Sequence, residues 1–125
     1  FGWIHAFAHG GDLLTEVICH PSFPKSDIAE AFEIIGKIFK RVEIRFTNDE
    51  DWRLARAFYE PILRGKIEPS LLTAWLQTVE FPLKEANDFH KFSNFRSCLL
   101  EVYVKLDQQN FLQDDLKEAI QSFQY

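Results

Sequence analysis

The sequence predicts an all-α domain, and three features of it support this prediction. Apolar residues recur at intervals of three and four through nearly every segment, which places them on one face of a helix. Strict alternation of apolar and polar residues, the pattern of a half-buried strand, does not extend beyond a few positions. Glycine and proline separate the periodic blocks. We therefore expect six amphipathic helices joined by short loops, and no β-strands.

The first helix is predicted over residues 2–19. It ends before Pro21, because the residue that precedes a proline is driven out of the helical region. Gly10 and Gly11 lie inside it, each at a cost of about 1 kcal/mol relative to alanine. Such a pair indicates close approach of another backbone, a local break or room for a ligand. One apolar stripe is expected to face the neighbouring helices: Trp3, Phe7, Leu14 and Ile18.

The five other helices are predicted from the same periodicity and from residues that begin or end helices. Thr47 and Glu50 have the spacing of a capping box for the third helix, and Gly65 is suited to end it. Pro61 removes one backbone hydrogen bond inside this helix and predicts a kink or an early end. Trp52 is expected on its buried side. The approximate spans expected are 27–42, 48–64, 69–79, 87–106 and 112–123.

The six helices are expected to form three antiparallel pairs of roughly 40 residues each, a length typical of HEAT or armadillo repeats. The predicted architecture is therefore a fragment of an α-α superhelix. A closed helical bundle is the alternative, because the pairs show no convincing similarity to one another. Residues 1–125 are expected to be a single domain. The absence of an initial Met, with the helical pattern already present at Trp3, indicates a fragment or the ordered part of a longer chain.

Composition excludes several classes of function. The chain has 14 Lys and Arg against 19 Asp and Glu, a formal net charge of -5, which argues against a nucleic-acid partner. No apolar run reaches the roughly 18 residues of a membrane helix. Cys19 and Cys98 have no C-x-x-C spacing, so we expect neither a disulfide framework nor a cysteine zinc site, and a reduced, cytoplasmic setting. The nucleophile-elbow, phosphate-loop and dinucleotide motifs are also absent, which argues against an enzyme.

Four polar residues share one stripe of the first predicted helix: His5, His9, Asp12 and Glu16. This stripe lies opposite the apolar one and is expected to face away from the neighbouring helices. Two imidazoles and a carboxylate suit zinc or another divalent transition metal, with His20 as a fourth ligand. The alternative is a packing or interaction face. Ala6 follows the first histidine, so the general base of the H-E-x-x-H metalloprotease pattern is missing.

Charged and aromatic residues elsewhere have simpler interpretations. Residues 48–51 (Asn-Asp-Glu-Asp) form an acidic cluster that suits the start of the third helix, where the helix dipole favours negative charge. Arg53 and Arg56 follow one turn later and are expected on the solvated surface. The indole N–H of Trp75 needs a hydrogen-bond partner if the ring is buried.

The run Gly2-Trp3-Ile4-His5-Ala6-Phe7-Ala8-His9-Gly10-Gly11-Asp12-Leu13-Leu14 resembles the signature G-W-x-H-A-x-A-H-G-x-D-L-L of a bacterial family, domain of unknown function number 2785. The resemblance extends over essentially the whole chain. It implies an all-helical, HEAT-like fold and no established activity, with this chain as the C-terminal part of longer proteins.

The functional expectation is a non-catalytic helical scaffold that binds a protein partner or a second copy of itself. No cofactor is predicted for this function. The competing hypothesis is a metal-binding or metal-dependent enzyme domain that uses His5, His9 and Asp12.

Overall fold

The computed structural model describes residues 2–43, 45–46 and 49–123, with only the backbone of residues 2–9. Its helices are α1 (Gly2–Cys19), α2 (Ile28–Arg41), α3 (Glu50–Leu63), α4 (Pro69–Leu76), α5 (Ala86–Gln108) and α6 (Asp114–Gln121), with a 3-10 turn η1 (Lys25–Asp27) before α2. No strand occurs among these residues, so the all-α prediction is confirmed. In the same part of the chain, no helix is both long enough and apolar enough to span a membrane.

The ends of the helices follow local chemistry. Gly65 has a φ of 75°, the left-handed conformation that glycine adopts readily, and it follows the end of α3 as predicted. α3 continues for two residues beyond Pro61. Thr47, half of the predicted capping box, lies outside the described residues. At the start of α5, the Asp88 carboxylate accepts a hydrogen bond from the backbone N–H of Glu85 at 3.0 Å, and the helix begins at Ala86, one residue before the predicted start at position 87.

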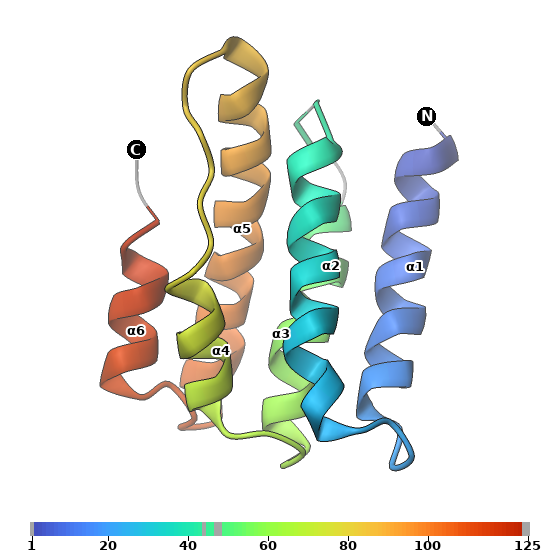
Figure 1. The fold of residues 1–125 in the computed structure, drawn as a ribbon, viewed down its shortest axis with the longest axis vertical. Coiled ribbons are helices and arrows are strands. Elements are labelled where there is room, and N and C mark those ends of the chain that lie inside the picture. Colours follow the sequence, from blue (N-terminus) through green and yellow to red (C-terminus); the bar gives the residue numbers. More distant parts are fainter. Residues whose placement is uncertain (1, 44, 47–48, 124–125) are drawn as a thin grey trace.

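The six helices form two rows (Figure 1). In one row α3 contacts α1 on one side and α5 on the other, and in the second row α4 lies between α2 and α6. Helices of the first row run in one direction and those of the second row in the opposite direction (Figure 1). Each consecutive pair of helices therefore contributes one member to each row.

An aromatic core fills the space between the rows. Phe95 of α5 lies at its centre and is fully buried. Its ring centroid is 4.9 to 6.4 Å from those of five other rings: Phe39, Phe58, Trp75, Phe81 and Phe123. The indole N–H of Trp75 donates to Glu33 Oε2 at 2.9 Å, so the predicted need for a partner is met.

Trp52 differs from its prediction, because its side chain is 54% exposed. α3 has helices on two sides, α1 and α5, and buries a broad arc of its surface that includes Leu54, Phe58 and Ile62. At about 100° per residue, Trp52 falls just beyond the edge of this arc. The apolar pattern alone did not show where the arc ends.

Candidate functional site

The buried side of α1 overlaps only in part with the predicted one. Ile18 is buried as predicted and Leu14 is half-buried, but Gly11 and Thr15, which lie outside the predicted stripe, are also buried. Leu13 and Val17, on the far side, are 68% and 43% exposed. The helix is thus rotated by roughly 60° from the orientation that its apolar pattern predicts. The side chains of Trp3 and Phe7, also expected to be buried, lie outside the described residues.

Gly11 explains this rotation. A Cβ atom built on Gly11 would lie 2.9 Å from Leu54 Cδ2 and 3.3 Å from Leu54 Cα, so α1 and α3 approach closely at this point. Thr15 supports the contact, because its hydroxyl donates to the Gly11 carbonyl oxygen at 2.8 Å and is satisfied while fully buried. A Cβ at Gly10 would have no atom within 4 Å. Of the three interpretations of the double glycine, close backbone approach is confirmed, and only for Gly11.

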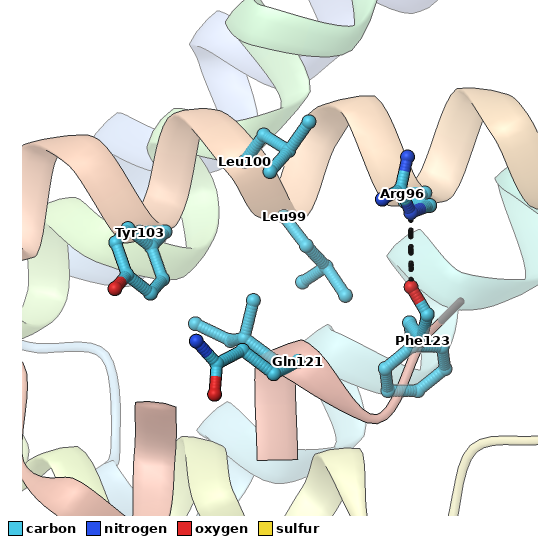
Figure 2. Close-up of a pocket in the computed structure, with 7 residues that line it drawn as sticks. Arg96, Leu99, Leu100, Tyr103, Gln121 and Phe123 are labelled. Atoms are coloured by element: carbon cyan, nitrogen blue, oxygen red, sulfur yellow. Dashed lines mark hydrogen bonds between the residues drawn. The ribbon is translucent and has the colours of Figure 1, made fainter. Parts of the chain in front are cut away.

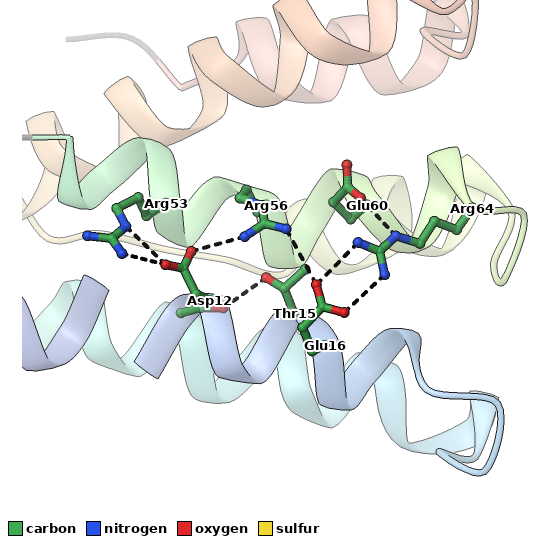
Figure 3. Close-up of polar contacts among 8 residues, drawn as sticks. Asp12, Thr15, Glu16, Arg53, Arg56, Glu60 and Arg64 are labelled. Atoms are coloured by element: carbon green, nitrogen blue, oxygen red, sulfur yellow. Dashed lines mark hydrogen bonds and ion pairs between the residues drawn. The ribbon is translucent and has the colours of Figure 1, made fainter. Parts of the chain in front are cut away.

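Beside this contact, carboxylates of α1 meet arginines of α3 (Figure 3). The Asp12 carboxylate accepts from Arg53 Nη2 at 2.5 Å, from Arg53 Nε at 3.1 Å and from Arg56 Nη1 at 3.1 Å. Six residues make up this arrangement, which we call the α1–α3 clasp: Asp12, Glu16, Arg53, Arg56, Glu60 and Arg64.

The second half of the clasp is more open to solvent. Glu16 accepts from Arg56 Nη2 at 3.5 Å and from Arg64 Nη2 at 3.3 Å. Arg64 also donates through Nε to Glu60, four residues earlier on α3, at 2.8 Å. The three guanidinium groups of the clasp therefore meet three carboxylates.

Two predictions are corrected by the clasp. Asp12 and Glu16 do not face away from the neighbouring helices, and Arg53 and Arg56 are not merely solvated surface. The physical reason is that the periodicity of a helix reflects only its own residues, whereas Coulomb attraction acts between the charged residues of two helices. A signal was nevertheless present. Charged residues recur at i, i+3, i+7 and i+11 along α3 and its C-cap, and this row runs alongside Asp12 and Glu16: Arg53, Arg56, Glu60 and Arg64.

The clasp shifts the ionisation of both α1 carboxylates. Burial by itself raises the pKa of Asp12, but the hydrogen bonds and charges of Arg53 and Arg56 outweigh it, so this pKa lies below its ordinary value. Arg64, by hydrogen bonding and charge, also lowers the pKa of Glu16. Both side chains are therefore held in the charged form that the arginines bind.

Replacing Asp12 with Asn is expected to lower the free energy of unfolding by about 1 kcal/mol, because solvent screening limits a pair that is partly exposed. The pKa of Asp12 is lowered from 3.8 in the folded state, so the stability it contributes is present above about pH 4 and is lost as the pH falls through the folded pKa. Urea denaturation of wild type and Asp12→Asn between pH 7 and about pH 3 measures this difference, which should shrink towards acid pH.

The exposed Asp107, near the end of α5, offers a control. The variant Asp107→Asn should change stability by less than about 0.5 kcal/mol. A stability difference between wild type and Asp12→Asn that does not depend on pH would contradict the ion-pair interpretation.

The predicted metal ligands are only partly described. The backbone of α1 places His5 and His9 one turn apart, but their side chains lie outside the described residues. His20 lies in the turn after α1, where its Nδ1 accepts from the Ser22 backbone N–H at 3.1 Å. The rise of a helix separates His9 from His20 by about 16 Å, so the structure does not bring His20 to the predicted set. Among the side chains that the structure describes, no cluster of three or more His, Cys, Asp or Glu could hold a metal.

The described surface has several hollows, two of which lie beside α5 and α1. A pocket of about 380 Å³ lies between α5 and α6 (Figure 2). Arg96 at its edge donates through Nε to the Phe123 carbonyl oxygen at 3.1 Å. The second hollow, of about 300 Å³, borders the exposed side of α1, and we call it the α1 groove. Its walls are almost entirely apolar: Gly10, Gly11, Leu13, Leu14, Val17, Ile38 and Leu54.

These features define a class of protein: an all-helical domain in which arginine–carboxylate pairs hold the first helix to the third, with an apolar groove on the opposite side of the first helix. The chain belongs to the DUF2785 family of proteins of unknown function, whose model matches residues 1–118. Family membership predicted from the resemblance is thereby confirmed. In the other comparisons, no curated protein and no solved structure matches the chain.

Proposed function

We propose that the chain is a non-catalytic interaction module that binds a protein through the outer side of α1 and α2. The observation that carries this proposal is the exposure of large apolar side chains around the α1 groove. Leu13 is 68% exposed and Val17 43%, and both line the groove. Ile34, 50% exposed, lies one helical turn before Ile38 of α2, which also lines it. Grouped exposed apolar residues of this kind typically mark a protein interaction site.

The shape of the groove supports the same function. Leu13 and Val17, one turn apart on α1, form one wall, and Ile38 of α2 belongs to the lining. A hollow of about 300 Å³ has room for one or two apolar side chains of a partner, as when an amphipathic helix lies along a groove. Each apolar side chain covered there contributes about 1 to 2 kcal/mol to binding, because its surface is removed from water.

We also propose that the two rows of helices are a segment of a HEAT or armadillo superhelix. Such folds stack helix pairs so that equivalent helices run parallel within a layer. The direction of the helices in each row supports this arrangement. Helical-repeat proteins generally act through extended recognition surfaces, in agreement with a non-catalytic role.

A substitution in the groove tests the proposed function. Val17→Asp is expected to abolish self-association or partner capture from an extract of the source cells, because it places a charge among apolar contacts. Val104→Asp is a matched control, since Val104 of α5 is 45% exposed and lies outside the groove. Sedimentation and affinity capture provide the two measurements. A wild-type chain that is monomeric and recovers no partner, or equal effects of the two variants, would refute the proposal.

The metal-binding hypothesis has less support. Asp12 would have to leave Arg53 and Arg56 in order to bind a cation, and this exchange costs the ion pairs of the clasp. Elemental analysis of protein purified without added metal separates the two functions. Stoichiometric zinc, iron, manganese or nickel, with a melting temperature that rises on metal addition, would support a site at His5 and His9.

A further inference from the structure

We draw no further inference here: the strongest candidate, the pocket of about 380 Å³ between α5 and α6, carries nothing because the cation at its edge, Arg96, already ties α5 to the chain after α6 through the Phe123 carbonyl oxygen, and nothing in the described part of the structure shows what ligand would occupy it.

Discussion

Replacing Phe95 with Ala is expected to lower the free energy of unfolding by about 4 kcal/mol, the largest effect of any single substitution considered for this chain. The Phe95 ring is fully buried and contacts rings from both rows of helices. Its removal would take away apolar burial and leave a cavity that five surrounding aromatic rings cannot fill by small movements. Urea denaturation followed by circular dichroism measures the change.

Phe89 provides a control on the same helix. Its side chain is 46% exposed, so Phe89→Ala should cost less than about 1 kcal/mol. Equal losses of stability for the two variants would show that α5 tolerates a cavity at its centre, and that the two rows are not held together through Phe95.

Replacing Gly11 with Val is expected to lower the free energy of unfolding by about 3 kcal/mol. The Cβ atom alone would come within 3.3 Å of the Leu54 main chain, and the branched methyl groups would extend further towards α3. Since backbone atoms cannot move aside as a flexible side chain can, α1 would have to shift away from α3. That shift would also lengthen the ion pairs of the clasp at Asp12.

The neighbouring glycine should respond differently to the same change. Gly10 has open space around the position of its Cβ, so Gly10→Val is expected to leave stability unchanged within about 0.5 kcal/mol. Thermal denaturation of both variants provides the comparison. A similar melting temperature for Gly10→Val and Gly11→Val would show that the close approach of α1 to α3 is not required for stability.

Only the α1 half of the clasp was singled out from the sequence, and its orientation was not predicted. Asp12 and Glu16 were recognised as part of one polar stripe with His5 and His9, whose side chains lie outside the described residues. The partners of these two carboxylates lie on α3, 40 to 48 positions away in the chain, so no local pattern could have joined them. Leu13 and Val17, which border the α1 groove, were not recognised as an exposed apolar surface because the predicted core direction of α1 was wrong.

The sequence by itself determined that this protein is helical, and it located most helix ends. Both depend on interactions within a few residues, such as apolar periodicity, the restriction that Pro21 places on its neighbour, and the conformational freedom of Gly65. The tertiary structure alone decided which side of α1 is buried. Gly11 has no side chain and adds nothing to an apolar pattern, yet the lack of a Cβ allows α1 to approach Leu54 of α3 closely. Arg53, Arg56 and Arg64 then hold the helix in that orientation through charges that act across space, independent of position in the chain.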